Sequence, residues 1–324
     1  MHVYEETLIT VKNLAELTEN NCLWLKIASD LLSCEMVQVN HAISVKGDVG
    51  SIARAESVLE AIDTFIGKGE QLDASTVRYL CLLEKENRLS EFLEEQSPVL
   101  FTTPQGRTIR AKTLGQRVYV DAISKNDVVI CKGPAGSGKT FLGVAMAVLA
   151  LRNRSVSHII LTRPAVEAGE KLGYLPGDIE EKVDPYMRPI YDALLELMGR
   201  ENFERNLERG IIEVSPLAYM RGRNLDDAFI LLDEAQNTTI EQMMMFLTRM
   251  GMNSKVCVCG DTTQIDLPYG FRNGLDDAMK VLCGIEGIEM VALKEGDIVR
   301  NPLVQKIIMA YNARERSDRK DAEQ

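Results

Sequence analysis

The sequence predicts an α/β protein with an open parallel sheet, preceded by a small α+β domain. Three observations carry this prediction. A glycine-rich loop, residues 133–140, lies between an apolar run that indicates a buried strand and a long apolar run that indicates a helix. Strand-like and helix-like segments then alternate, as they do in parallel sheets. Residues 5–66 instead follow the order strand, helix, strand, strand, helix. These patterns are typical of a P-loop NTPase core of the RecA or helicase type with a KH-like N-terminal domain.

Chain length and local composition predict where the domains divide. A chain of 324 residues is long enough for two domains, because about 100–200 residues per domain is usual. A loop with proline and glycine follows an acidic helix end near residue 95, and we place the boundary there. The predicted parts are a KH-like module at residues 1–95, a linker at 96–106, a P-loop core at 107–313 and a polar tail at 314–324.

Composition and cysteine usage indicate a protein of the cytoplasm. The chain is 45% hydrophobic and 26% charged, which is ordinary for a soluble protein. No run approaches the roughly 18 uncharged apolar residues of a membrane-spanning helix, and residues 1–6 lack the features of a signal peptide. Seven cysteines without a Cys-x-x-Cys motif and three scattered histidines predict free thiols in a reducing compartment, and no protein-ligated zinc site. We expect a cytoplasmic location and no membrane partner.

Charge is distributed unevenly along the chain. Residues 1–100 carry 17 Asp and Glu against 8 Lys and Arg, and the whole chain has a formal net charge of −11. Phosphate contacts need local positive charge, so any RNA contact must use a local patch. One candidate is the group Arg107, Arg110, Lys112 and Arg117, which no acid interrupts. A solvated basic strand and loop is the alternative for these residues.

The N-terminal module resembles a KH domain in the predicted order of its elements. Two short alternating runs around Asn40-His41 predict a tight hairpin between helices. KH domains hold single-stranded RNA through a GXXG loop. Gly47-Asp48-Val49-Gly50 has these letters, but it follows a strand and contains an acid, so we expect a turn there. The module is either an RNA-binding domain or a docking and regulatory surface.

The glycine-rich loop predicts a nucleotide-phosphate site. It matches G-x-x-x-x-G-K-[ST] at every fixed position, and a strand before it and a helix after it are the setting that this motif requires. Backbone N–H groups of such a loop surround phosphate oxygens, and the helix N-terminus adds positive charge. Lys139 is expected on the β- and γ-phosphates and Thr140 on Mg²⁺. The predicted nucleotide-binding residues are Gly133, Pro134, Ala135, Gly136, Ser137, Gly138, Lys139, Thr140 and Phe141.

Two adjacent carboxylates follow a later apolar strand. Residues 229–232 end in Asp233 and Glu234, at the carboxyl end of a strand where ligands gather in doubly wound sheets. We expect Asp233 beside Mg²⁺ and Glu234 as the base that polarises the attacking water. Two strand-like segments lie between this motif and the phosphate loop. That spacing suits ATPases whose catalytic glutamate follows the metal-binding aspartate.

Two glutamines extend the predicted site. Gln264 follows the next strand-like run, where its side chain can sense the γ-phosphate and pass its state to a bound partner; a capping turn is the alternative. Gln116 lies seventeen positions before Gly133, where helicase-like ATPases use a glutamine to read the adenine edge. No Asn-Lys-x-Asp guanine motif occurs. The predicted cofactors are therefore ATP and Mg²⁺.

A single core still needs an arginine to offset charge on the transferring phosphoryl group. Either Arg300 serves in the same chain, or a neighbouring subunit supplies Arg221 or Arg223, which predicts a ring. A surface salt-bridge loop is the alternative for the second pair. Thr162-Arg163-Pro164-Ala165 follows the second strand of the core, where helicases place a strand-contacting loop, and the glycine-rich stretch 166–189 is a second candidate RNA contact.

Several long runs between residues 100 and 312 are specific to one family and do not arise from the fold alone. These runs are GPAGSGKT, LTRPAVEAGEKLGYLPGD, EEKVDP, PLAYMRGR, LLDEAQNTT, GDTTQIDLP and DIVRNPLV. Through them the core sequence resembles the PhoH family of ATPases over residues 100–312. The N-terminal module looks like the KH-like domain of the branch without a fused PIN nuclease. Asn301 departs from the His expected after Arg300.

The resemblance implies ATP hydrolysis, a helicase-like core and a ring-shaped homo-oligomer, expected to be a hexamer. It also implies a link to RNA metabolism or phosphate starvation and an endoribonuclease of the YbeY type as partner.

Two functions are consistent with these residues. The first is a Mg²⁺-dependent ATPase that acts on RNA or an RNA–protein particle, in which Lys139, Glu234, Gln264 and Arg300 are catalytic. The second is an ATP-gated docking protein that recruits a nuclease through the acidic N-terminal module without separating strands.

Overall fold

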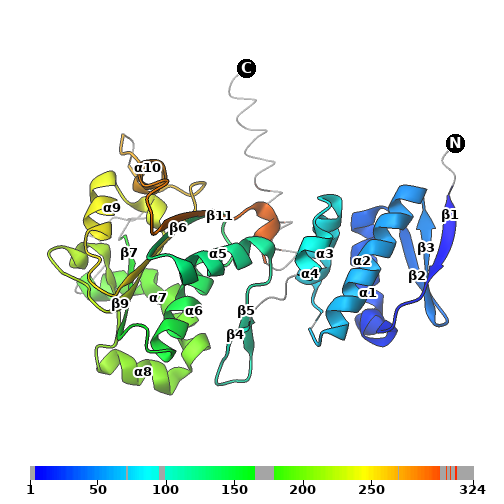
Figure 1. The fold of residues 1–324 in the computed structure, drawn as a ribbon, viewed down its shortest axis with the longest axis horizontal. Coiled ribbons are helices and arrows are strands. Elements are labelled where there is room, and N and C mark those ends of the chain that lie inside the picture. Colours follow the sequence, from blue (N-terminus) through cyan, green and yellow to red (C-terminus); the bar gives the residue numbers. More distant parts are fainter. Residues whose placement is uncertain are drawn as a thin grey trace. The chain divides into compact units, whose positions relative to one another are not determined.

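The computed structural model describes residues 4–70, 72–94, 99–164, 179–268 and 270–299, with isolated positions at 304, 307 and 311. Side chains of residues 179–185 are not described. The chain forms two compact units, of which the second is Ser97–Ile298 (Figure 1). The predicted end of the core at residue 313 and the predicted polar tail lie outside the described residues.

The N-terminal unit has the predicted order strand, helix, strand, strand, helix. Its three strands form an antiparallel sheet in the order β1-β3-β2. Asn40 takes the left-handed conformation (φ 55°) that a tight hairpin between the second and third strands needs. The elements are β1 (Glu5–Ile9), α1 (Leu14–Leu32), β2 (Glu35–Val39), β3 (Ala42–Gly47), α2 (Val49–Gly67), α3 (Ala74–Lys85) and α4 (Leu89–Glu94).

Alternation along the strands gives this sheet one buried face. Ile43 and Val45 of β3 are fully buried, and Ile9 of β1 pairs with Ile43 on the same side. Gly47-Asp48-Val49-Gly50 joins β3 to α2, and the Asp48 side chain caps the helix by accepting from the Ser51 N–H at 3.0 Å. The stretch is therefore a strand-to-helix turn, as its sequence predicts, and not a loop between two helices.

The second unit contains a six-stranded parallel sheet in the order β11-β6-β10-β9-β7-β8. Its central strands read as continuous apolar runs because both of their faces are buried. A two-stranded hairpin precedes the sheet. The elements are β4 (Val99–Thr102), β5 (Thr108–Arg110), α5 (Leu114–Lys125), β6 (Val128–Lys132), α6 (Lys139–Arg152), β7 (His158–Arg163), α7 (Ile179–Met198), α8 (Arg200–Glu208), β8 (Ile212–Pro216), β9 (Ala228–Leu232), α9 (Ile240–Leu247), β10 (Lys255–Gly260), α10 (Gly274–Val281) and β11 (Ile288–Ala292).

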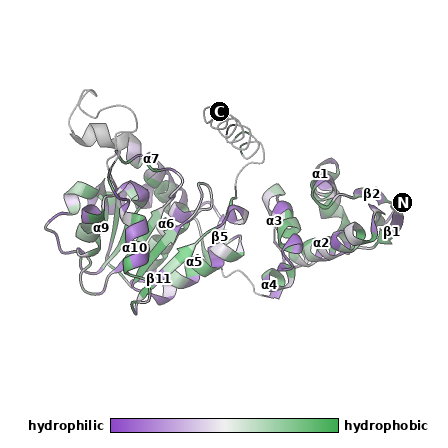
Figure 2. Cartoon of the chain, turned by 90° about the horizontal axis from the view of Figure 1, so that it is seen from above, coloured by the Kyte–Doolittle hydropathy of each residue, from purple (hydrophilic) through white to green (hydrophobic). Residues whose placement is uncertain are grey.

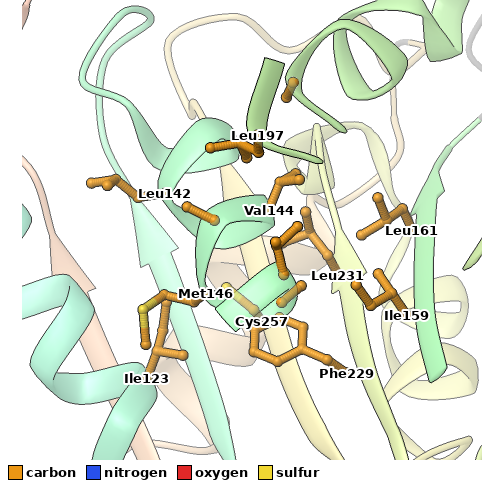
Figure 3. Close-up of a cluster of buried hydrophobic side chains, with 14 of the residues drawn as sticks. Ile123, Leu142, Val144, Met146, Ile159, Leu161, Leu197, Phe229, Leu231 and Cys257 are labelled. Atoms are coloured by element: carbon orange, nitrogen blue, oxygen red, sulfur yellow. The ribbon is translucent and has the colours of Figure 1, made fainter. Parts of the chain in front are cut away.

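Helices cover both faces of this sheet, so the core has two layers. Val129 and Cys131 of β6 pack toward α5, α6, α7 and α8, whereas Val128 and Ile130 pack toward α9 and α10. Side chains of α6 and of β7 and β9 point toward one another in the larger layer (Figure 3). Figure 2 shows hydrophobic residues concentrated on α6 and on the strands. This is the doubly wound arrangement that the sequence predicts.

The strand order sets the position of the candidate site. One strand, β10, lies between β6, which leads into the phosphate loop, and β9, which leads into Asp233 and Glu234. Since the strands are parallel, their carboxyl ends meet at one edge of the sheet. The phosphate loop, the carboxylates and the turn after β10 therefore gather there. In the part of the chain that the structure describes, no helix is long and apolar enough to cross a membrane.

Candidate nucleotide-binding site

The phosphate loop connects the end of β6 to the first residue of α6. Gly136 and Gly138 both take left-handed backbone conformations (φ 85°), which glycine adopts without steric cost. Gly133 is packed so closely that an added Cβ would lie 2.7 Å from Leu293 Cβ. Its N–H donates to the Gly260 carbonyl at 3.1 Å, which ties the loop to the end of β10. Phe141, the third residue of α6, packs against the larger core layer.

Lys139 already points into the loop. Its Nζ donates to the carbonyls of Gly133 at 2.6 Å and Pro134 at 3.0 Å, and the residue is 7% exposed. Ser137 closes the same turn, since its hydroxyl donates to the Pro134 carbonyl at 2.8 Å. The ammonium group is thus held within the loop, where it can reach the phosphates of a nucleotide.

Thr140 and Asp233 come together across the edge of the sheet. The Thr140 hydroxyl donates to Asp233 Oδ1 at 2.6 Å, and Asp233 is 2% exposed. A hydroxyl and a carboxylate are the hard oxygen ligands that Mg²⁺ selects, and Mg²⁺ usually combines one or two protein ligands with phosphate oxygens. The residues present therefore fit the expected metal.

Glu234 has an unusual backbone. Its φ is 54°, a left-handed conformation that is rare for a residue with a side chain. Its side chain is 46% exposed, so the carboxylate is open to water while its neighbour Asp233 is buried. Residues held in such conformations cluster at functional sites, where surrounding contacts fix them. Gln236 supplies one of these contacts, donating from Nε2 to Glu234 Oε2 at 2.6 Å.

Gln236 connects the carboxylate turn to the turn after β10. The residue is 1% exposed, and its Nε2 also donates to the Gln264 carbonyl at 3.1 Å while its Oε1 accepts from the Asp261 N–H at 2.9 Å. The side chain of Gln264 is exposed and donates to Asp261 Oδ2 at 2.8 Å. Sequence reasoning missed Gln236. The available signal was a polar residue three positions after Asp233, within a turn already assigned to the site.

Comparison with known proteins agrees with this geometry. The family model described as PhoH-like protein matches residues 108–312. The chain belongs to the PhoH family. A PhoH-like protein of Bacillus subtilis is 50% identical over 293 residues, covering 90% of this chain and 92% of its own length. A PhoH-like protein of Mycobacterium tuberculosis is 48% identical and covers 89% of this chain and 81% of its own length. Protein PhoH of Escherichia coli is 45% identical over 63% of this chain and 58% of its own length.

Membership of the PhoH family and a P-loop fold make this chain an ATPase in general terms, and such ATPases generally use ATP and Mg²⁺. The phosphate loop, Thr140, Asp233, Glu234, Gln236 and Gln264 all lie at the carboxyl edge of the core sheet. For Gln116, Arg163 and Arg223, the contacts differ from what the sequence leads one to expect.

Gln116 of this PhoH family member supports the phosphate loop directly. The residue is 4% exposed, its Nε2 donates to the Ser137 carbonyl at 3.0 Å, and its Oε1 accepts from the Lys112 N–H at 2.7 Å. The nitrogen and the oxygen of the Gln116 side-chain amide, which the sequence assigns to adenine, are therefore both bonded to backbone groups. Reading a base would require these bonds to be exchanged, so adenine recognition stays a prediction.

Arg163, at the end of β7, faces the carboxylates. Its Nε donates to Asp233 Oδ2 at 2.8 Å, its Nη2 also contacts that oxygen, and its Nη1 donates to the Tyr186 carbonyl at 2.8 Å. Nη2 lies 4.0 Å from Glu234 Oε1. The sequence places Arg163 in a strand-contacting loop, whereas its guanidinium belongs to the metal edge of the site.

The predicted arginine fingers have different environments. Arg223 makes a two-point ion pair with Glu213, with N–O distances of 2.5 Å and 2.7 Å, and these bonds lower the pKa of Glu213. Arg221 is exposed and, among the described contacts, its guanidinium has no partner. An arginine that acts on a neighbouring subunit must be free to reach it, so Arg221 is the better candidate of the two. Arg300 lies outside the described residues.

The candidate RNA contacts receive less support from the geometry. Arg107, the first residue of the predicted basic patch, forms an ion pair with Glu196, and the two side chains are 59% and 42% exposed. Its charge is thus locally offset. The glycine-rich stretch 166–189 lies outside the described residues up to residue 178.

A buried polar group lies beneath the start of α6. The Tyr119 hydroxyl is 3.3 Å from the Lys139 carbonyl, 2.9 Å from Cys257 Sγ and 3.0 Å from Cys259 Sγ. Burial raises the pKa of Tyr119 and of Cys259 well above their ordinary values, so both groups stay protonated. Through its contact with the Lys139 carbonyl, the Tyr119 hydroxyl supports the start of the helix.

Proposed function

We propose that this protein is a Mg²⁺-dependent ATP hydrolase that couples ATP binding and hydrolysis to the remodelling of RNA or an RNA–protein particle. The observation that carries the proposal is the link from Glu234 through Gln236 to the Gln264 turn. A carboxylate placed to act on water, and bonded to an exposed loop, is suited to hydrolysis that a partner can sense.

Each residue of the site has a definite task in this proposal. The loop N–H groups and Lys139 bind and orient the β- and γ-phosphates. Thr140 and Asp233 would hold Mg²⁺, which when bound neutralises charge on the phosphate oxygens. The exposed carboxylate of Glu234 orients the attacking water and accepts its proton. Because Lys139 and Asp233 are buried, water screens them little, and their electrostatic interactions with a bound nucleotide and metal are strong.

The arginine that completes the site comes from a second copy of the chain in this proposal. Arg221 is exposed on a turn that contains Gly222, and a homo-oligomeric ring, expected to be a hexamer, would present it to the next subunit. Arg300 in the same chain is the other source. An arginine finger is worth roughly 10³–10⁵ in kcat, so its source can be identified by substitution.

A second function is favoured by the N-terminal unit. Its 8 basic residues against 17 acidic ones in residues 1–100 do not favour a polyanion partner. Its GXXG letters also form a helix cap instead of a loop between helices. In this alternative the unit docks an endoribonuclease of the YbeY type in the cytoplasm, and ATP binding in the core gates the docking.

ATP hydrolysis with and without single-stranded RNA tests the proposal, with Glu234→Gln as the matched variant. Glu234→Gln keeps the hydrogen bond from Gln236 but cannot accept a proton, so we expect hydrolysis to fall by about 10²-fold or more with ATP binding retained. Severalfold stimulation of the wild-type rate by RNA supports the remodelling function. Hydrolysis that ignores RNA favours the docking function, and hydrolysis that survives Glu234→Gln refutes the assignment of the base.

A further inference from the structure

The guanidinium of Arg163 is hydrogen-bonded to Asp233, the carboxylate expected to bind the metal. Asp233 accepts from Thr140 through Oδ1 and from Arg163 through Oδ2, so protein donors use both of its oxygens. The side chains of Arg163 and Asp233 are 12% and 2% exposed. A buried carboxylate is costly without a compensating charge, and Arg163 supplies that charge.

The same guanidinium reaches a third element. Arg163 Nη1 donates to the carbonyl of Tyr186 on α7 at 2.8 Å, while Nη2 lies 4.0 Å from Glu234 Oε1. Because the guanidinium is a rigid planar fork, moving it away from Asp233 also changes its contact with α7. One side chain thus connects the expected metal-binding aspartate, the expected catalytic base and α7.

We propose that Arg163 is a positioning residue that stands in for the metal: it holds Asp233 in the metal-free protein, leaves it when Mg²⁺ binds with nucleotide, and thereby alters its contact with α7. The inference rests on the proposed function, because it takes Asp233 as a metal ligand. Its physical basis is that a guanidinium and a divalent cation repel each other and compete for the same oxygen. Metal binding would then change the contact between Arg163 and α7 before any hydrolysis occurs.

The first test measures metal binding without turnover. Mn²⁺ replaces Mg²⁺, ADP is the nucleotide, and free Mn²⁺ is followed by electron paramagnetic resonance. Arg163→Gln removes the competing charge, so we expect Mn²⁺ to bind about tenfold more tightly than in the wild type. Arg188→Gln is the control, since it makes the same charge change at an exposed position on α7 and should leave Mn²⁺ affinity unchanged. Equal or weaker Mn²⁺ binding in Arg163→Gln would overturn the inference.

The outcomes separate this inference from the proposed function. If the wild type with ADP binds no Mn²⁺, the metal site itself is wrong and the proposed function fails. If the wild type and Arg163→Gln bind Mn²⁺ equally, only the role of Arg163 fails. Should Arg163→Gln not fold, Arg163→Lys is used instead: it keeps the charge but loses the two-point contact with Asp233 Oδ2, so it competes less well with the metal and is expected to bind Mn²⁺ severalfold more tightly. No tightening in Arg163→Lys would then contradict the inference.

Hydrogen exchange of the wild type tests the connection to α7. Adding Mn²⁺ to the ADP-bound protein is expected to increase amide exchange in residues 186–198, because the guanidinium releases the Tyr186 carbonyl. Arg163→Gln should show this faster exchange already without metal. If amide exchange in α7 of the wild type does not change when Mn²⁺ is added, the proposed link between metal binding and α7 is contradicted.

Discussion

The N-terminal sheet and the core sheet each carry a carboxylate paired with a basic side chain, but in opposite environments. Glu6 and Lys46 lie 3.4 Å apart on the open face of the N-terminal sheet, with 53% and 49% of their side chains exposed. Arg163 and Asp233 lie at the carboxyl edge of the core sheet and are almost fully buried. Water screens the first pair, whereas only the protein, or a metal, can balance the second. In this chain the buried pair at the strand ends belongs to the candidate site, and the exposed pair on the N-terminal sheet does not.

The largest expected effect follows from breaking the buried pair. Asp233→Ala leaves the guanidinium of Arg163 buried without its main partner, and we expect the free energy of unfolding to fall by about 3 kcal/mol. Urea denaturation followed by circular dichroism measures this change. Glu6→Gln, at the exposed pair, is the control and should produce no measurable shift.

The single tryptophan makes the measurement specific to one unit. Trp24 lies buried in α1, so its fluorescence reports on the N-terminal unit. If the two units unfold separately, Asp233→Ala moves the circular dichroism transition and leaves the Trp24 transition in place. An Asp233→Ala protein as stable as the wild type would show that the pair is balanced by other charges.

A smaller effect is expected from a glycine in each unit. Gly138 of the phosphate loop and Gly69 after α2 both have left-handed backbones, with φ of 85° and 78°. Alanine in that conformation costs roughly 1–2 kcal/mol at either position. At Gly138 the new Cβ also lies 3.1 Å from Gln116 Nε2, whereas at Gly69 it meets nothing within 4 Å. Gly138→Ala should therefore also weaken ADP binding in a fluorescence titration, and unchanged ADP affinity would refute the support role of Gln116.

The smallest effect concerns the partly exposed pair of Glu213 and Arg223. Arg223 lowers the pKa of Glu213, so the folded state holds this carboxylate deprotonated more strongly than the unfolded state does. Its stabilising contribution is fully present above the ordinary pKa of 4.5 and is lost as the pH falls below that value. Because the side chains are about one third exposed, we expect Arg223→Gln to cost less than about 1 kcal/mol at pH 7 and less at pH 3 than at pH 7. A cost that is equal at both pH values would exclude the pair as its source.

Sequence patterns predicted the elements, and they predicted that the phosphate loop and Asp233 would meet at one edge of the sheet, because both features depend on local order. The phosphate loop needs only a strand before it and a helix after it, and Asp233 needs only to end a buried strand. The contacts of Arg163 and Gln236 depend on which strands are neighbours. β7 and β9 lie side by side in the sheet although β8 comes between them in the chain, and no spacing in the sequence states this.

Two side chains show a further limit of sequence reasoning. Gln116 has the spacing of a base-reading glutamine, yet its amide is bonded to Ser137 and Lys112. Arg223 has the surroundings of a finger in sequence, yet Glu213, ten positions earlier, pairs with it. A polar side chain can satisfy several partners, and only the folded backbone decides which of them is within reach.

The burial of the cysteines has a practical consequence for labelling chemistry. Thiol reagents attack the thiolate, and burial raises the pKa of Cys81 to about 12 and of Cys34 to about 11; burial also raises the pKa values of Cys131 and Cys259 well above their ordinary value. Cys283, just after α10, is the exposed thiol of the seven. A maleimide dye should therefore attach there first. A fluorophore at that point would leave the buried thiols, including the two beneath the start of α6, unmodified.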